Sequence, residues 1–275
     1  MIYSSFFQGE VYDARKESEI KGWMKPGFDD THWKKAVTVN QERAIVDDPS
    51  IKANKMPPVN DFSELQLIGQ FGPTVKKIKE LTAVSMEEVR PGVFVYDMGQ
   101  NMVGVPCITL RDIHPGTEIK LRYAEVKYPA MPEFKENVGM IMLENIRGAL
   151  AQDIYITKGG EETIKPHFTF HGYRYIEITG IGMPLPLEAV KGDVLSSIHE
   201  LSTSYVTSNP KVNKLWENIT WSARGNFLSI PTDCPQRNER MGWSGDISVF
   251  SRTATYIGDM EQFLSRHMMA MRDTQ

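Results

Sequence analysis

The sequence has 275 residues, of which 41% are hydrophobic and 24% charged, ordinary values for one large globular domain or two smaller ones. Its net charge of −4 argues against a surface for nucleic acid or anionic lipid, and no apolar run approaches the roughly 20 residues of a membrane span. The first residues lack a basic region followed by an apolar core, so we expect a cytoplasmic protein, or a periplasmic or secreted one if the natural N-terminus lies further upstream.

Residues 1–60 show little periodicity and carry turn signals at Lys25-Pro26-Gly27 and at Pro57-Pro58. We interpret this segment as the tail of an N-terminal β-domain followed by a linker.

Residues 61–203 alternate with a period of two, which predicts strands. Ile119, Leu121 and Tyr123 share one face of such a strand, while Lys120 and Arg122 point the other way. The other expected strands are short apolar stretches ended by turn residues, at 93–96, 107–110, 153–157, 168–170 and 173–178. Several short strands at close spacing favour an antiparallel β-sandwich domain.

From residue 204 to residue 275 the period becomes helical. Ser208-Asn209-Pro210 is typical of a helix start, with a capping side chain and proline at the first helical position. A second helix is expected from near Asp246 to Tyr256, ended by Gly258, and a third carries Phe263 and further apolar residues at helical spacing. The apolar stripes of three helices cannot cover one another fully. We therefore expect self-association or a complementing chain at these faces.

The segment between the first two helices, residues 231–246, is called the acidic segment here. It holds three carboxylates, two arginines and a tryptophan: Asp233, Arg237, Glu239, Arg240, Trp243 and Asp246. Carboxylates and an indole gathered in one segment are what a sugar-cleaving site needs, because such a site uses a protonated carboxyl and an ionised one. Glu239 can act as the acid where neighbouring carboxylates and burial favour its protonated form. The guanidinium of Arg237 and the indole of Trp243 can hold a sugar.

Structural roles for the same residues stay open at this point. Asp246 can be a first-turn helix acid, Trp243 can fill a core, and the two arginines can form salt bridges with Glu239 and Asp233. His167 and His171 lie four apart, but in a predicted strand they do not make a helical metal pair, so we expect structural roles. Cys107 and Cys234 have neither metal nor disulfide spacing and are expected as free thiols.

Five separated motifs resemble bacterial α-L-rhamnosidases, glycoside hydrolase family 78. The most specific is Thr232-Asp233-Cys234-Pro235-Gln236-Arg237-Asn238-Glu239-Arg240 followed by Gly242-Trp243-Ser244-Gly245-Asp246. The others are similar to the family in type and order, and stand at residues 9–15, 96–104, 121–126 and 168–175. The resemblance therefore covers nearly the whole chain.

The resemblance implies a multidomain β + α protein: an antiparallel β-sandwich followed by the first helices of an (α/α)6 barrel, apparently truncated. It implies inverting hydrolysis of terminal α-L-rhamnosides, with Glu239 as general acid. By the same resemblance the residues that hold the rhamnose are Asp233, Arg237, Trp243 and Asp246. No cofactor and no metal is implied. The family's general base lies in the second half of the barrel, so the chain alone is expected to be inactive.

Two other functions stay open beside the enzyme. The first is a carbohydrate-binding or accessory β-sandwich module, and the second is a non-functional truncated gene product. A binding module would use exposed aromatic platforms, for which the candidates are Tyr96, Tyr123, Tyr155, Tyr173 and Tyr175. The expected partner is a rhamnose-containing oligosaccharide or glycoside, with no nucleic acid and no membrane.

Overall fold

The computed structural model describes residues 1–37 and 68–273. The chain divides into two compact units, one made of Met1–Glu19 and Phe71–Gln275 and the other of Ile20–Gln70. In the described part of the second unit, the ring of Trp33 packs against Trp23 and Phe28, at centroid distances of 6.3 and 5.6 Å. The expected linker, the Pro57-Pro58 pair and the boundary near residue 60 lie outside the described residues.

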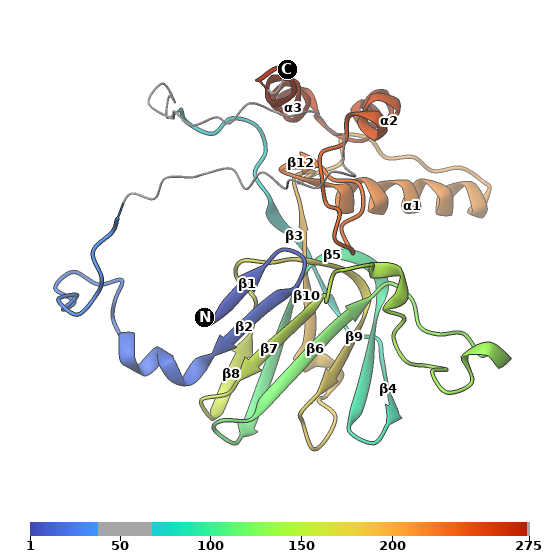
Figure 1. The fold of residues 1–275 in the computed structure, drawn as a ribbon. Coiled ribbons are helices and arrows are strands. Elements are labelled where there is room, and N and C mark those ends of the chain that lie inside the picture. The colour runs from blue at the N-terminus through green and yellow to red at the C-terminus, as the bar shows by residue number, and fades with distance from the viewer. Residues whose placement is uncertain (38–67, 274–275) are drawn as a thin grey trace, which may run out of the picture. The chain divides into compact units, whose positions relative to one another are not determined.

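The first unit is built on a sheet of ten strands (Figure 1). The strands are β1 (Tyr3–Ser5), β2 (Gly9–Asp13), β3 (Lys76–Thr82), β4 (Ser85–Arg90), β5 (Val93–Ile113), β6 (Glu118–Ala124), β7 (Gln152–Ile156), β8 (Gly160–Ile164), β9 (His171–Thr179) and β10 (Val190–Ser196). Their order is β1-β2-β7-β6-β9-β5-β10-β3, and β4 and β8 also pair with β5. The pairing is antiparallel apart from β2 with β7, which is parallel. The first residues of the chain thus share a sheet with strands as distant as β10.

β5 corrects one prediction, because the apolar stretches 93–96 and 107–110 belong to a single strand of 21 residues. One edge of β5 pairs with β9 and then β8, and the other pairs with β4 and then β10. The register with β9 shifts between Asp97 and Met102, where Gly99 has a φ of 74°. A glycine in this left-handed region allows the strand to bend without ending. The two halves of the expected sandwich are therefore parts of one continuous curled sheet.

The core confirms the alternating pattern and the order of strands before helices. Ile119, Leu121 and Tyr123 of β6 are all buried, as their spacing predicts. They join Tyr96 from the first half of β5 and Leu110 from its second half in one apolar cluster. The curled sheet therefore encloses a single core, to which both halves of β5 contribute.

The segment 168–170 is not the predicted strand. The ring of Phe168 is 63% exposed. The backbone amides of His167 and Phe168 donate to the buried carboxylate of Glu10, at 3.0 and 3.2 Å. A side chain has taken the hydrogen bonds that a strand neighbour would otherwise make, so β9 begins only at His171.

His171 has the structural role that we expected. Its ring is fully buried and its Nε2 lies 3.0 Å from Oδ2 of Asp153. Asp153 also accepts from the Tyr123 hydroxyl at 2.5 Å and from the backbone amide of Glu10 at 2.7 Å. The Tyr123 ring stacks on His171 with centroids 4.0 Å apart. This network links β2, β6, β7 and β9 inside the sheet.

The helices begin and end close to the predicted places. They are α1 (Pro210–Asn226), α2 (Ser244–Ile257) and α3 (Glu261–Asp273). Asn209 caps α1 by accepting from the Lys211 amide at 3.0 Å, and Gly258 follows the end of α2. Two short strands, β11 (Phe227–Leu228) and β12 (Ile230–Pro231), lead from α1 into the acidic segment. The remaining elements are 3-10 helices: η1 (Ala14–Ile20), which has seven residues, and the single turns η2 (Pro132–Phe134), η3 (Glu144–Ile146) and η4 (Leu187–Ala189).

A second apolar cluster joins the helices to one another and to the end of the sheet. Phe227 packs its ring 4.7 Å from Phe263 of α3, and its carbonyl accepts from the Ser197 amide at 2.7 Å. The opposite faces of the helices carry exposed apolar side chains, with Val249 84% and Met268 61% exposed. Within the described residues, no helix has the length and apolar character to cross a membrane.

Gly104 lies where β5 packs closely against β10, and a substitution there tests this packing. A Cβ at this position would lie 1.9 Å from the carbonyl oxygen of Asp193, so the backbone would have to move. We expect Gly104→Ala to lower the free energy of unfolding by about 3 kcal/mol, measured by urea denaturation. Gly182→Ala is the matched control, because no atom lies within 4 Å of its Cβ position. Equal urea midpoints for the two variants would show that the sheet does not pack in this way.

Candidate functional site

Arg240 anchors the acidic segment to the sheet. Its guanidinium is buried and donates to the backbone carbonyls of Phe6 and Phe170, and its Nε donates to the carbonyl of Arg237 at 3.1 Å. The guanidinium carbon also lies 4.8 Å from the centroid of the Phe170 ring. Burial lowers the pKa of Arg240 to about 10, which still leaves it charged at neutral pH.

The salt bridges that we considered for the two arginines form at only one of them. Arg237 places Nε and Nη2 at 2.9 and 2.7 Å from Oε2 of Glu239. Among its contacts in the described residues, Arg240 meets carbonyls and aromatic rings and no carboxylate. A third arginine, Arg147, reaches the same Oε2 atom of Glu239 at 2.9 Å. Glu239 is therefore bound by two guanidiniums.

Arg147 comes from the loop that follows η3, a part of the chain that the sequence did not connect with the site. Its backbone adopts a left-handed φ of 56°. The next amide, of Gly148, donates to the Asn238 side chain at 3.3 Å, and the Leu150 amide donates to Gln8 at 2.9 Å. Residues 147–150 therefore join Gln8 to the acidic segment, although the three lie far apart in sequence. A lone arginine in a loop carries no local signal of such a contact.

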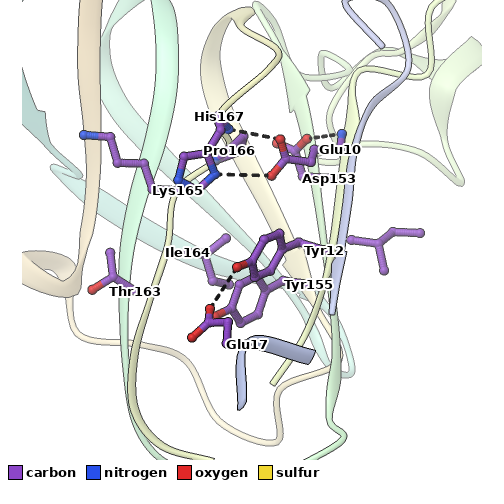
Figure 2. A pocket seen from close by; sticks show the side chains of 11 residues that line it. Glu10, Tyr12, Glu17, Asp153, Tyr155, Thr163, Ile164, Lys165, Pro166 and His167 are labelled. Atoms are coloured by element: carbon purple, nitrogen blue, oxygen red, sulfur yellow. Dashed lines mark hydrogen bonds and ion pairs between the residues drawn. The ribbon is translucent and has the colours of Figure 1, made fainter. Parts of the chain in front are cut away.

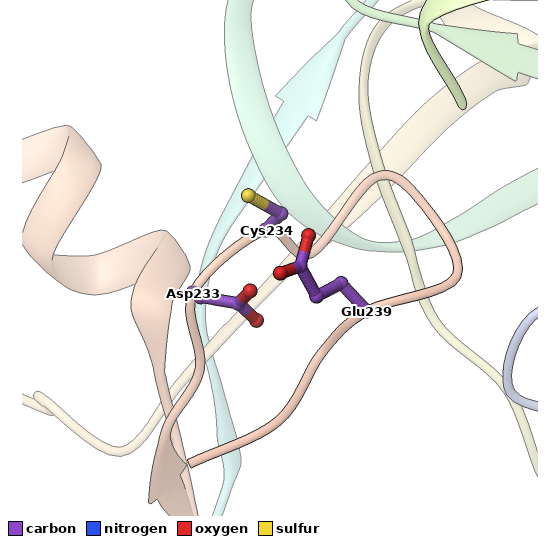
Figure 3. A group of neighbouring side chains, drawn as sticks. All are labelled: Asp233, Cys234 and Glu239. Atoms are coloured by element: carbon purple, nitrogen blue, oxygen red, sulfur yellow. The ribbon is translucent and has the colours of Figure 1, made fainter. Parts of the chain in front are cut away.

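Asp233 and Glu239 lie together with Cys234, and their ligand-type atoms are all within 4.8 Å of one another (Figure 3). Burial works to raise the pKa of Asp233. Hydrogen bonds from the Cys234 backbone, the Glu239 carboxyl and the Met241 amide outweigh it, so that the pKa is lowered. Burial raises the pKa of the Cys234 thiol. The lowered pKa favours the ionised form of Asp233, which lies beside the carboxyl of Glu239. A cation at this cluster would have to compete with two guanidiniums for Glu239.

Asp233 and Asp246 share a cavity of about 200 Å³ between α1 and α2, called the aspartate cavity here. Its walls include the apolar side chains of Phe227 and Phe250. Thr232, also in the wall, has a buried Oγ1 without a hydrogen-bond partner among the described residues. Ionised or polar oxygens beside apolar rings are suited to a ligand with both hydroxyl and methyl groups.

Trp243 lies apart from this cavity. It precedes α2 and its side chain is 51% exposed, so the core role considered for it is wrong. Asp246 stands in the first turn of α2, where a carboxylate favours the helix, and at the same time lines the aspartate cavity. The structure thus brings Asp233 and Asp246 to one cavity and pairs Arg237 with Glu239, but it leaves Trp243 outside.

A smaller cavity of about 60 Å³ lies on the sheet near β2 and β7 (Figure 2). The rings of Tyr12 and Tyr155 stack in its wall with centroids 5.6 Å apart, and the Tyr12 hydroxyl donates to Glu17 at 2.9 Å. Four of the tyrosines considered as sugar platforms are buried: Tyr96, Tyr123, Tyr155 and Tyr173. The rings of Tyr96, Tyr123 and Tyr173 fill the sheet core, and that of Tyr155 packs against Tyr12 in the wall of this small cavity.

Three domains of bacterial rhamnosidases match the chain in order. Residues 1–59 match the α-L-rhamnosidase N-terminal domain. Residues 87–196 match the bacterial α-L-rhamnosidase concanavalin-like domain. Residues 201–275, which include the acidic segment, match the bacterial α-L-rhamnosidase 6 hairpin glycosidase domain.

Individual relatives agree. The chain is 41% identical over its whole length to an α-L-rhamnosidase from Streptomyces avermitilis, and it covers 24% of that protein. It is 33% identical to an α-L-rhamnosidase from Alteromonas sp. strain LOR and covers 26% of that protein. Among solved structures, the α-L-rhamnosidase of Dictyoglumus thermophilum is 36% identical with a TM-score of 0.82 over 99% of this chain and 27% of that one. The Streptomyces avermitilis enzyme complexed with L-rhamnose is 39% identical with a TM-score of 0.82, over 100% and 24%. The chain spans about a quarter of the length of these relatives.

Proposed function

We propose that this chain, which belongs to the bacterial α-L-rhamnosidase family, supplies the acid half of a site that hydrolyses terminal α-L-rhamnosides. One observation carries the proposal: the carboxyl groups of Glu239 and Asp233 lie within 4.8 Å of each other, and Asp233 lines a cavity that it shares with Asp246. The ligand we propose is a rhamnose-containing oligosaccharide or glycoside. A relative crystallised with L-rhamnose supports that choice.

In the proposed reaction Glu239 gives its proton to the glycosidic oxygen as the bond from that oxygen to the anomeric carbon breaks. A water molecule attacks the anomeric carbon from the opposite face and loses its proton to a second carboxylate, which inverts the configuration. By resemblance to the family, that second carboxylate is a residue beyond these 275. Asp233 and Asp246 accept hydrogen bonds from the sugar hydroxyls, and the apolar walls of the aspartate cavity receive the methyl group.

Arg237 and Arg147 both reach Oε2 of Glu239 in the free protein, at the carboxyl that gives its proton in the proposed reaction. The acid must hold that proton before the reaction. We therefore infer that a bound sugar draws Arg237 away from Glu239 and onto its own hydroxyls. Arg237 then serves as a substrate-binding residue in the complex and as the partner of Glu239 in the free protein.

Titration with L-rhamnose, followed by NMR, tests the proposed ligand. We expect binding in the millimolar range, weakened about tenfold or more in Asp233→Asn and Asp246→Asn, because each loses a charged hydrogen-bond acceptor. Asp273→Asn is the control, since Asp273 pairs only with its exposed neighbour Arg272 among the contacts described. If wild type does not respond to millimolar L-rhamnose, the proposed function is wrong.

A further inference from the structure

We propose that a second cavity, between the sheet and α1, binds the sugar to which the cleaved rhamnose is attached. This cavity has a volume of about 390 Å³. It is called the amide cavity here, after the side chains in its wall: Gln100, Asn101, Asn218 and Gln236, with Glu125 and Trp221. The inference rests on the proposed function and assigns the leaving-group side of the same site.

The position of the amide cavity relative to the acid is the first argument. Asp233 and Cys234 both line it, and each has a side-chain atom within 4.8 Å of the Glu239 carboxyl. Asp233 also lines the aspartate cavity, so one side chain stands at both. A general acid protonates the oxygen of the leaving group. The amide cavity lies beside Glu239, and Asp233 stands between it and the aspartate cavity, where we place the rhamnose. The leaving group therefore belongs in the amide cavity.

The chemistry of the wall is the second argument. Each carboxamide offers a donor and an acceptor side by side, which matches the paired hydroxyls of a sugar ring. Asn101 donates to Glu125 at 2.8 Å, which leaves its amide oxygen and the second oxygen of Glu125 available. The Asn226 Oδ1 atom, at the end of α1 in the same wall, is buried without a partner among the described residues. These groups are suited to a neutral ligand rich in hydroxyls.

The size and construction of the cavity agree with a sugar ligand. Its volume falls within the range of about 300–1,000 Å³ typical of small-molecule sites. Gln100 and Asn101 lie where β5 bends between Asp97 and Met102, so the irregularity of the strand presents both amides to the cavity. On the other wall, Lys79 lies over the Trp221 ring with Nζ 5.6 Å from its centroid, which fixes the indole at the edge of α1.

Residues of the sheet, as well as residues of the helices, therefore bind the leaving group. A preference for one rhamnoside over another would reside in Gln100 and Asn101 of β5, in Glu125 directly after β6, and in Asn218 of α1. None of these residues lies in the acidic segment, so they can change without disturbing the acid.

The test compares two ligands on the 275-residue protein: methyl α-L-rhamnoside and a disaccharide of α-L-rhamnose linked to glucose. We expect the disaccharide to bind about tenfold more tightly, and Asn101→Ala combined with Asn218→Ala to remove that advantage while affinity for the methyl glycoside stays unchanged. Glu217→Ala is the control, because Glu217 is the exposed neighbour of Asn218 and pairs with Lys214 outside the cavity.

Alkylation of Cys234 by iodoacetamide, followed by mass spectrometry, locates the ligand. The disaccharide should slow modification of Cys234 several-fold more than the methyl glycoside does, while Cys107, which is outside the cavity wall, reacts at an unchanged rate. Equal protection by both ligands, or an advantage that survives in the double variant, overturns the inference and leaves the proposed function standing. Binding of neither ligand overturns both.

Discussion

In the presence of azide, Glu239→Gln should reduce the rate at which the protein cleaves alkyl α-L-rhamnosides by about 10²–10⁴-fold, the usual contribution of a general acid. The 275-residue polypeptide alone should show no turnover above buffer, because the proposed catalytic base lies outside it. Azide supplies the missing nucleophile: it forms a bond to the anomeric carbon as the glycosidic bond breaks, and the departing alkoxide takes the Glu239 proton. The rate supported by azide is therefore the quantity to measure in wild type and variant.

The leaving group separates an acid from a residue that only shapes the site. A 2,4-dinitrophenolate departs without a proton, so Glu239→Gln should slow cleavage of that glycoside far less than cleavage of the methyl glycoside. Glu217→Gln, on the exposed face of α1, should change neither rate. An equal loss with both leaving groups would remove Glu239 from the acid role. Rapid turnover without azide would mean that a residue within the chain acts as the base.

Arg240→Ala should lower the free energy of unfolding by about 3 kcal/mol, the largest loss that we expect from a side chain of the acidic segment. The substitution leaves the carbonyls of Phe170 and Arg237 without the donor described for them, and it leaves the Phe6 carbonyl with only the Thr169 hydroxyl at 3.4 Å. Carbonyls that lose their partners away from water cost about 1–3 kcal/mol each, part of which water recovers here because the bonds are part-buried. It also removes the guanidinium from the Phe170 ring.

Urea denaturation measures the loss, and hydrogen exchange shows where it falls. The amides of the acidic segment and of residues 5–8 should lose protection together, since Arg240 joins them. Arg272→Ala is the matched control, because Arg272 is exposed at the end of α3 and pairs with Asp273 alone among its described contacts. A midpoint equal to that of the control would show that the anchor contributes nothing to stability.

Local signals explain which elements the sequence predicts well. The start of α1 rests on Asn209 and Pro210, which act on the adjacent backbone, and the buried face of β6 rests on strict alternation. β4 is different: most of its six residues are exposed and half are charged, so no apolar alternation marks it, and its pairing with β5 alone makes it a strand. β5 has two apolar ends joined by polar residues, and only the sheet reveals it as one strand.

The residues of the candidate site also divide into those that a local sequence signal predicts and those that only the fold brings together. Asp233, Glu239 and Asp246 are predicted from a short acidic segment, and the structure places Asp233 beside each of the other two. Arg147 reaches Glu239 across 92 residues of sequence, and nothing near Arg147 indicates this contact. Trp243 lies outside the aspartate cavity because of the direction in which α2 leaves the acidic segment. The composition of the segment does not determine that direction.

The hydrogen bond from Arg240 to Phe6 spans 234 residues and has a consequence for how the protein is made. At the usual synthesis rate of about 5–20 residues per second, Phe6 leaves the ribosome roughly 10–50 seconds before Arg240 does. For the first part of that interval β2 waits, since its parallel partner β7 comes from more than a hundred residues further on. Until β7 is made, the hairpin that will hold the acidic segment in place has an unpaired strand edge in the nascent chain, and such an edge is exposed to aggregation.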